Sequence, residues 1–341
     1  MSPTATGALA EPALIFDLGG KFDKSFNEAA FAGAQRWVEE TGGTYKELEM
    51  QSEAQREQAL RRLAESGLNP IVTTGFAFGE VLNKVAPDYP DTRFVIIDTV
   101  VDQPNVQSNV YAEPEGSYLA GVLAGMASKT GTVGFIGGMD IPLIHKFRCG
   151  YAEGFKAARP DGKVITNFTG TTPAAWNDPV KGGELARAQK AQGADVIYAA
   201  AGGTGIGVLQ AAADEGILSI GVDSNQNHLH PGKVLTSMVK RVDNSVYEAF
   251  KAGEAVEPSH FEGVPRPEVV EAGEPLRAVC DPARFAMVDE HPDGSCCAQL
   301  GLLSGGVLFT LGHSRVTDDV RHDSASCCSC ARRSRSAASW S

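Results

Sequence analysis

The segment ALIFDLGGKFDKSFNEAAFAGAQRWVEE at residues 13–40 contains a predicted strand, a turn and a helix. Its apolar run Ala13–Phe16 is short and continuous, which is typical of a strand buried on both faces of a parallel sheet. The two adjacent glycines that follow permit a tight turn. Residues 27–39 then place apolar side chains on one face at helical spacing: Ala30, Ala34, Trp37 and Val38. The segment therefore predicts the first strand–helix unit of an α/β domain.

The same alternation of strand and helix continues along the chain. Further buried strands are predicted at Pro70–Thr73, Arg93–Ile97, Thr132–Ile136, Asp195–Ala199 and Leu218–Val222. Amphipathic stretches of helical length separate them, such as residues 53–64. The pattern runs twice, over about 12–101 and about 130–221, and a helix rich in small residues is predicted between the two runs, at 113–129. We therefore expect two lobes, each a doubly wound parallel sheet, with a ligand cleft where the carboxyl ends of their strands face each other.

The predicted domain boundaries follow from these patterns. We assign residues 1–10 to the remnant of an export signal and 11–112 to the first lobe, to which part of the later chain can return. Residues 113–250 form mainly the second lobe with crossover segments, and 251–341 form an atypical tail. In that tail the periodicity fades while prolines, cysteines and arginines accumulate, which predicts a poorly ordered segment or one translated in a shifted frame.

Composition narrows the class of function. The chain has 341 residues, 43% of them hydrophobic and 21% charged, with a formal net charge of -12. A nucleic-acid partner is not expected, because neutralising phosphates requires a basic face. Docking on an anionic membrane surface is disfavoured for the same reason. No run approaches the roughly 18 apolar residues that span a bilayer.

The two ends of the chain each leave an alternative open. Ala8-Leu9-Ala10 has the small residues that signal peptidase requires, or it is a disordered terminus that contains this pattern by chance. Cys149 is the single cysteine of the first 279 residues, and the other six lie in the last 62. The tail is therefore either out of frame, an unrelated fusion, or a small disulfide-bonded appendage.

Three acidic residues follow predicted strands directly: Asp17, Asp98 and Asp223. Any one of them could cap the next helix. Three at equivalent strand ends favour a polar cleft, where a carboxylate accepts hydrogen bonds from vicinal hydroxyls or from ring N–H and amino groups.

The loop after the first strand offers an aromatic side chain beside polar ones. Ser25 and Glu28 have the spacing of a capping box at the start of the helix. Phe26 then lies in the loop or the first turn, where it can stack on a planar ring, or else serve as a hydrophobic staple.

The glycine-rich segment AGGTGIG at 201–207 follows a predicted strand but lacks the order of a dinucleotide fingerprint and the lysine of a P-loop. Such a turn can direct backbone N–H groups toward a ligand oxygen. We find no nucleophile elbow, no metal-binding spacing and no complete catalytic set, so neither metal nor cofactor is expected. His228 and His230 are expected to lie in a solvent-side loop.

Several motifs together resemble one family. They are DLGGKFDKSFNEAAFAGAQ at 17–35, GGMDIPLIHKFRCGYAEGF at 137–155, WNDPVKGGELA at 176–186, AAAGGTGIGVLQAA at 199–212, IGVDSNQ at 220–226 and TSMVKRVD at 236–243. Over about 12–250 the chain resembles the basic membrane protein family of substrate-binding lipoproteins, which includes purine nucleoside receptors. The resemblance implies a two-lobed fold of the type I periplasmic-binding-protein kind, which captures a nucleoside and delivers it to an ABC permease.

The resemblance also implies roles for individual residues. The base would stack on Phe26, with Asp17 contacting base or sugar and Asn27 adjacent, while Asp223 and Lys240 would hold ribose hydroxyls. The turn of Gly202, Gly203 and Thr204, together with Trp176 and Asp98, completes the predicted site. The family's export signal usually carries a lipidated cysteine; none is present near residue 10, so a soluble periplasmic monomer is expected.

Two other classes of function remain open from the sequence. An α/β enzyme acting on a nucleoside or sugar could use Asp17 and Asp23 in hydrolysis, although no metal or nucleophile accompanies them. A regulatory domain of the same fold would need an attached DNA-binding or membrane segment, and the sequence offers none.

Overall fold

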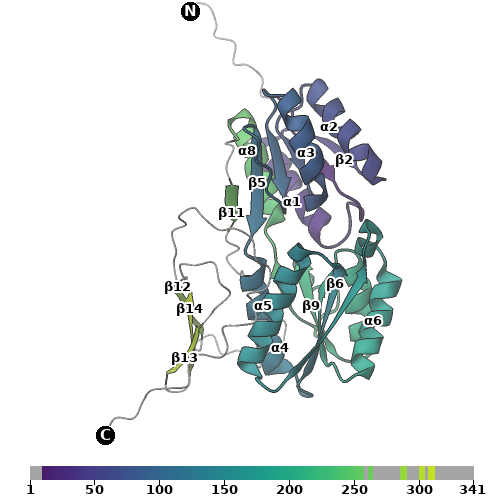
Figure 1. Ribbon diagram of the computed structural model, residues 1–341, viewed down its shortest axis with the longest axis vertical. Coiled ribbons are helices and arrows are strands. Elements are labelled where there is room, and N and C mark those ends of the chain that lie inside the picture. Colours follow the sequence, from purple (N-terminus) through teal and green to yellow (C-terminus); the bar gives the residue numbers. More distant parts are fainter. Residues whose placement is uncertain (1–9, 257–259, 264–284, 290–298, 304–305, 312–341) are drawn as a thin grey trace, which may run out of the picture. The chain divides into compact units, whose positions relative to one another are not determined.

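The computed structural model describes residues 10–256, 260–263, 285–289, 299–303 and 306–311 (Figure 1). The predicted signal remnant, apart from residue 10, and most of the predicted tail lie outside these ranges. The chain divides into two units, Met1–Val279 and Cys280–Ser341, which are described separately.

The first lobe contains a six-stranded parallel sheet in the order β11-β5-β4-β3-β1-β2. Its strands are β1 (Ala13–Phe16), β2 (Lys46–Glu49), β3 (Ile71–Thr73), β4 (Phe94–Ile97), β5 (Val106–Tyr111) and β11 (His260–Gly263). Its helices are α1 (Phe26–Thr41), α2 (Arg56–Glu65), α3 (Gly79–Val85) and α8 (Val242–Ala252). Short 3₁₀ turns lie at Glu53–Gln55, Phe76–Phe78, Ala86–Asp88 and Gly253–Ala255.

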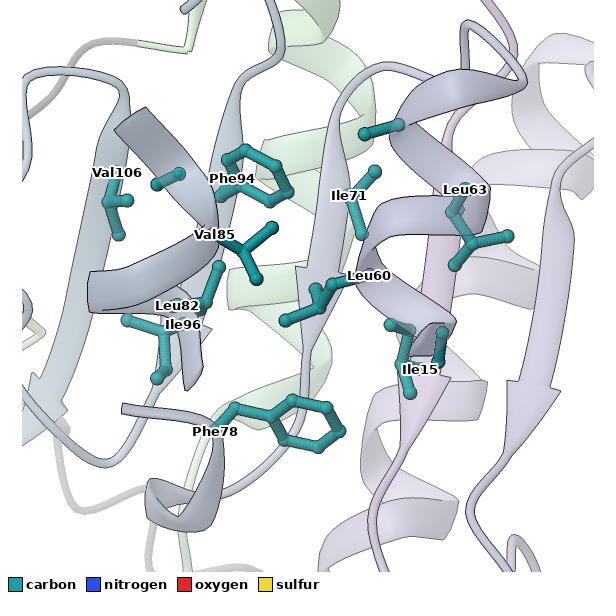
Figure 2. Packing of buried hydrophobic residues seen from close by; sticks show 14 of the residues in the cluster. Ile15, Leu60, Leu63, Ile71, Phe78, Leu82, Val85, Phe94, Ile96 and Val106 are labelled. Carbon is teal, nitrogen blue, oxygen red and sulfur yellow. The ribbon is translucent and has the colours of Figure 1, made fainter. Parts of the chain in front are cut away.

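Helices cover both faces of this sheet, because successive strand residues point to opposite sides. One face packs Ile15, Ile71 and Ile96 against α2 and α3, as Figure 2 shows for the cluster around Leu60. The other face packs Leu14, Phe16, Val72 and Val95 against α1 and α8. The continuous apolar runs that predicted the strands are thus explained by burial on two sides.

The second lobe contains a five-stranded parallel sheet in the order β10-β9-β8-β6-β7. Its strands are β6 (Thr132–Met139), β7 (Lys163–Gly170), β8 (Val196–Ala200), β9 (Leu218–Asp223) and β10 (Val234–Val239). Its helices are α4 (Glu113–Ala127), α5 (Pro142–Ala158), α6 (Pro179–Ala191) and α7 (Thr204–Asp214), with a 3₁₀ turn at Pro173–Trp176. The two doubly wound sheets confirm the predicted fold class.

Among the described residues of this unit, two crossovers link the lobes. The chain leaves the first lobe between β5 and α4 and returns to it between β10 and α8. Helix α8 then packs closely on α1, where a Cβ added to Gly33 would overlap the backbone oxygen of Asp243. Strand β11 extends the first sheet beside β5 as far as Gly263, beyond residue 250 where we placed the start of the tail.

The second unit contains a three-stranded sheet in the order β12-β14-β13. Strand β12 (Phe285–Asp289) is parallel to β14 (Gly306–Leu311), and β13 (Gln299–Leu303) is antiparallel to β14.

A large-to-small change in the first core tests its contribution to stability. Leu60 is fully buried between α2 and the sheet, so Leu60→Ala should lower the free energy of unfolding by about 2–5 kcal/mol through lost transfer energy and a residual cavity. Denaturant unfolding followed by circular dichroism measures the loss. Val180→Ala, at a side chain that is 73% exposed, is the control. Equal losses for the two variants would contradict this account of the core.

Candidate ligand-binding site

A pocket lies between the lobes at the carboxyl ends of their strands. The first lobe contributes Asp17–Gly19 after β1, Gly75 and Phe76 after β3, and Asp98 after β4. The second lobe contributes Ala200–Gly202 at the end of β8 and just after it, and Val222–Asp223 at the end of β9. In the first sheet β1 and β3 are neighbours at the point where the strand order reverses, which is where ligands bind in open α/β sheets.

The pocket brings together most of the residues predicted from the sequence: Asp17, Phe26, Asn27, Asp98, Trp176, Gly202, Asp223 and Lys240. Gly203 and Thr204 are not among its lining residues. The Thr204 hydroxyl is buried and already engaged, since it donates to the Ala175 carbonyl at 2.8 Å and accepts from the Asp178 N–H at 2.7 Å. Thr204 therefore holds the turn that carries Trp176.

Glycines provide the space for the Trp176 ring. A Cβ added to Gly138, in β6, would overlap the ring, so a side chain at this position would displace the indole. A Cβ added to Gly202 or Gly203, in the turn after β8, would lie 3.4 or 3.2 Å from the Trp176 carbonyl oxygen, and one added to Gly19 would lie 3.7 Å from the Trp176 Cβ. The indole is thus placed at the pocket by close contacts with backbone.

The Lys240 ammonium lies at the centre of a buried charge cluster. Its side chain is 2% exposed, and Nζ lies 2.5 Å from Asp98 Oδ1 and 3.2 Å from Glu113 Oε1. The rings of Phe26, Tyr111 and Phe147 surround it, with centroids 5.4, 5.0 and 5.5 Å from Nζ. Lys240 follows β10 and Glu113 begins α4, so this ion pair connects the two crossovers between the lobes.

Asp98 and Asp223 both adopt left-handed backbone conformations, with φ of 80° and 64°. A non-glycine residue in this region carries strain, and aspartate is among the residues that tolerate it best. These turns end β4 and β9 at the pocket. The cost is acceptable where the surrounding structure holds the residue, as the Lys240 contact does for Asp98.

Burial changes the acidity of the carboxyl groups at this site. It raises the pKa of Asp98 to about 6 and that of Asp223 to about 6, in spite of the opposing attraction of Lys240. Burial alone would lower the pKa of Lys240, but the field of Asp98, Glu113 and Asp223 raises it above its ordinary value. Three buried carboxylates around one ammonium leave an excess of negative charge.

The start of α1 differs from the predicted capping box. Ser25 does not cap the helix; instead Asp23 accepts the backbone N–H groups of Ser25, Asn27 and Glu28 at 2.8, 3.0 and 3.1 Å. The carboxylate reaches these donors because its residue lies two positions before the cap, and Glu28 accepts from Lys24 N. Burial raises the pKa of Asp23 to about 6.

The Ser25 hydroxyl is free for a contact with the second lobe. It donates to Asp223 Oδ2 at 2.6 Å. In return Ser224 Oγ donates to the Ser25 carbonyl at 2.7 Å, and Gln226 Nε2 donates to the Lys24 carbonyl at 2.9 Å. We call residues 24–25 and 223–226 the interlobe loops. They join the lobes beside the pocket through short hydrogen bonds.

Asn27 shapes the loop after β1. Its Nδ2 donates to the carbonyls of Asp17 and Gly20 at 3.1 and 3.2 Å, and its Oδ1 accepts from the Thr74 hydroxyl at 2.9 Å. Both amide protons are therefore committed to the chain itself.

Sequence reasoning missed two groups of residues at this site. Leu143, Ile144 and Phe147 form an apolar wall at the start of α5, and their helical spacing after a predicted strand could have indicated it. Arg56 and Glu113 lie just behind the pocket, where they contact Asp17 and Lys240. Nothing in their local sequence distinguishes them from surface charges.

The two carboxylates of the hydrolase alternative are both engaged. Asp17 is paired with Arg56 at 2.8 Å, and Asp23 caps α1. Among the described residues, no group of three or more His, Cys, Asp and Glu side chains is arranged to hold a metal ion. In the same part of the chain, no helix is both long and apolar enough to cross a membrane.

Comparisons with known proteins agree on one family. A sequence model of the PnrA-like ABC transporter substrate-binding proteins matches residues 11–262. The ABC transporter nucleoside-binding protein BmpA of Lactococcus lactis is 35% identical over 69% of this chain and 72% of that protein. An uncharacterised lipoprotein of Pyrococcus abyssi is 36% identical over 70% of this chain and 62% of that protein. The crystal structure of an ABC transporter solute-binding protein from Aeropyrum pernix superposes with a TM-score of 0.71, at 31% identity, over 76% of this chain and 75% of that one.

Replacing Asp223 with asparagine should change how stability depends on pH. Because the folded-state pKa of Asp223 is raised from 3.8 to about 6, its contribution is fully present below the unfolded pKa and lost as pH rises through about 6. The substituted amide would still accept from Ser25 but cannot ionise. The Tm of Asp223→Asn relative to the wild type should therefore rise between about pH 4 and pH 7.

Calorimetric scans in half-unit pH steps measure this difference. The control is Asp214→Asn, which removes an exposed carboxylate and should follow the wild type at every pH. A Tm difference between Asp223→Asn and the wild type that stays constant with pH would show that Asp223 titrates normally.

Proposed function

The chain belongs to the family of PnrA-like ABC transporter substrate-binding proteins, and we propose that it captures a nucleoside in the pocket between its two lobes. The family and the two-lobed fold inferred from the motifs are confirmed by the match over residues 11–262 and by the Aeropyrum pernix structure. The choice of ligand rests on the pocket, which combines aromatic surfaces with a buried charge cluster, and on the nucleoside-binding relative of Lactococcus lactis.

The apolar part of the pocket suits a flat heterocyclic base. Phe26 and Trp176 line it with aromatic surface, and the wall of Leu143, Ile144 and Phe147 adds aliphatic and aromatic contacts. Stacking a base on such side chains is favourable for any purine or pyrimidine, because every base has a π-face. In our proposal Phe26 is the principal stacking partner and Trp176 lines the same space.

The polar part of the pocket suits a sugar. Asp98 and Asp223 present carboxylates, and Lys240 presents an ammonium, within one buried cluster. A carboxylate accepts two hydrogen bonds from vicinal hydroxyls, and an ammonium donates to a hydroxyl oxygen. We assign the ribose to Asp223 and Lys240, with Asp98 holding Lys240 in place.

The charge of the pocket distinguishes nucleosides from nucleotides. Among its described lining residues, Asp17, Asp23, Asp98 and Asp223 are acidic and Lys240 alone is basic. A phosphate group would enter this excess of negative charge without a basic partner of its own. A neutral nucleoside is therefore the better ligand than a nucleoside phosphate.

Transport is the proposed role, with no chemistry performed on the ligand. Asp17 and Asp23 are committed to Arg56 and to the helix cap, so neither is placed as a free base. The partner is then the permease of an ABC importer, and the site of capture lies outside the cytoplasmic membrane, in a periplasm or its equivalent. A monomer without nucleic-acid partners remains our prediction from the sequence.

A ligand screen tests the proposal directly. Thermal-shift assays with purine and pyrimidine nucleosides, free bases, ribose and nucleoside monophosphates should show stabilisation by at least one nucleoside. A ligand at a hundredfold excess over Kd stabilises by about 2.7 kcal/mol. Chromatography of the same samples should return the nucleoside unchanged. Stabilisation by phosphates or sugars alone, or conversion of the nucleoside, would refute the proposal.

Phe26→Ala should weaken nucleoside binding by about 1–3 kcal/mol, the usual loss for an aromatic side chain on which a base stacks. Isothermal titration calorimetry measures the change. Phe22→Ala is the matched control, because Phe22 lies in the loop just before α1, is 62% exposed and does not line the pocket. Unchanged affinity in Phe26→Ala would remove this residue from the site.

Asp223→Ala should weaken binding of a nucleoside more than binding of the corresponding free base. The variant leaves ribose hydroxyls without an acceptor in the pocket, which costs roughly 1–3 kcal/mol. Competition titrations with both ligands give the two losses. Equal losses for nucleoside and base would show that Asp223 does not hold the ribose.

A further inference from the structure

Arg56 occupies an electrostatically unfavourable position. It is the first residue of α2, and its side chain is 6% exposed. A cation in the first turn of a helix faces the positive end of the macrodipole, and a buried cation is costly unless it is paired. Neither helix formation nor solubility accounts for an arginine here. The ion pair with Asp17, also in the first lobe, does account for a buried arginine at this position.

Both hydrogen bonds from the guanidinium to the Asp17 side chain go to one oxygen. Nε and Nη2 donate to Oδ1 at 3.1 and 2.8 Å, and the group lies 5.4 Å from the centroid of Phe78. Glu53 Oε2, on the outer side, is 3.7 Å from Nη1. Arg56 does not line the pocket, so it reaches the ligand space only through Asp17.

The second oxygen of Asp17 is left for the pocket. Both hydrogen bonds from Arg56 go to Oδ1, and the Leu18 N–H is a further backbone partner of the carboxylate, whereas Oδ2 lies near Gly75, another lining residue. A Cβ added to Gly75 would lie 3.2 Å from Oδ2, so the glycine keeps this side of the carboxylate open. The Asp17 N–H donates to the Thr74 hydroxyl at 2.9 Å, which fixes the backbone.

We infer that Arg56 is a positioning residue that determines specificity: by engaging Oδ1 alone, it holds Asp17 as an ionised acceptor whose Oδ2 requires an N–H or O–H donor on the ligand. The inference rests on the proposed function, because the donor belongs to a nucleoside. It adds a rule of selection, in which a nucleoside that lacks this one donor is rejected.

The charge of Arg56 is essential to this role. Burial raises the pKa of Asp17, and the guanidinium opposes the rise, whereas Glu53 adds to it. The other charged groups of the pocket are Asp23, Asp98, Asp223 and Lys240. Without Arg56, a buried Asp17 beside these acids favours the protonated form, which can donate and no longer requires a donor.

The test compares inosine with analogues that each lack one donor: 1-methylinosine, 2′-deoxyinosine, 3′-deoxyinosine and 5′-deoxyinosine. Calorimetry gives the dissociation constants for the wild type, for Arg56→Gln, and for Arg61→Gln, which removes an arginine of the same helix that pairs with Glu57 and Asp88 on the surface. In the wild type, loss of the donor that meets Asp17 should weaken binding about tenfold to a hundredfold.

In Arg56→Gln, the loss of affinity for the analogue that lacks the donor to Asp17 should shrink to less than about threefold. The losses for the other three analogues should remain as in the wild type. Inosine binding by Arg56→Gln should also weaken more steeply than wild-type binding as pH falls, because Asp17 without the guanidinium takes up a proton at a higher pH than in the wild type. Arg56→Lys retains the charge and should restore the wild-type pH profile, which a merely structural role would not predict. Arg61→Gln should match the wild type throughout.

The double variant Asp17→Asn/Arg56→Gln keeps the test open if Arg56→Gln does not fold, because removing both charges of a buried pair is milder than removing one. The double variant should show the same reduced loss of affinity for the analogue that lacks the donor to Asp17. Its affinity for inosine should depend on pH no more steeply than that of the wild type. If nucleosides bind but all four penalties are unchanged in the Arg56 variants, the inference is wrong and the proposed function stands. If no nucleoside binds the wild type, both are wrong.

Discussion

The buried ammonium of Lys240 is the interaction on which the arrangement of the two lobes depends. It lies on one crossover, pairs with Glu113 at the start of the other, and contacts Asp98 at the end of a strand in the first lobe. Removing one partner from such a group leaves an uncompensated charge in a dry interior, which is strongly destabilising. The cluster therefore fixes the geometry of the connections between the lobes, and three aromatic rings surround the ammonium.

Polar groups of the pocket divide into those committed to the chain and those left for a ligand. The side chains of Asn27 and Thr204 form hydrogen bonds that hold loops. The Asp23 carboxylate binds the start of a helix, and the Ser25 hydroxyl donates to the opposite lobe. This commitment makes the pocket rigid before anything enters it. Preorganisation of this kind reduces the entropy lost on binding, so that few remaining polar atoms can supply both affinity and selectivity.

Much of this architecture could be predicted from the sequence, because buried strands produce continuous apolar runs and their carboxyl ends mark the ligand site. Asp17, Asp98 and Asp223 were found by that rule alone. Strand β2 could not be found in this way, since Lys46–Glu49 is an exposed edge with the sequence KELE. Asp23 takes the capping role expected of Ser25, because either side chain can reach the free N–H groups of a helix start and only the tertiary contact of Ser25 with Asp223 decides between them. Arg56 and Glu113 contribute to the site through contacts with Asp17 and Lys240, which lie far from them in the sequence. A local sequence pattern cannot predict such contacts.

The hydrogen bonds between the interlobe loops depend more on the side chains of the second lobe than on those of the first. Residues 24 and 25 offer their carbonyl oxygens to the second lobe, and a carbonyl is present whatever the side chain, whereas Ser224 and Gln226 must supply hydroxyl and amide donors. The Lys24 side chain takes no part in the contact with Gln226, so this position is limited mainly by its left-handed backbone, with φ of 57°, whereas Ser224 and Gln226 are constrained by the donors they supply. A chimera that takes its first lobe from a distant relative would keep these two contacts as long as the second lobe retains its own serine and glutamine. Shuffling of lobes between receptors is thus made easier by interlobe loops in which two contacts use only the main chain of the first lobe, and the Ser25 hydroxyl, which donates to Asp223, is the side chain that the first lobe must retain.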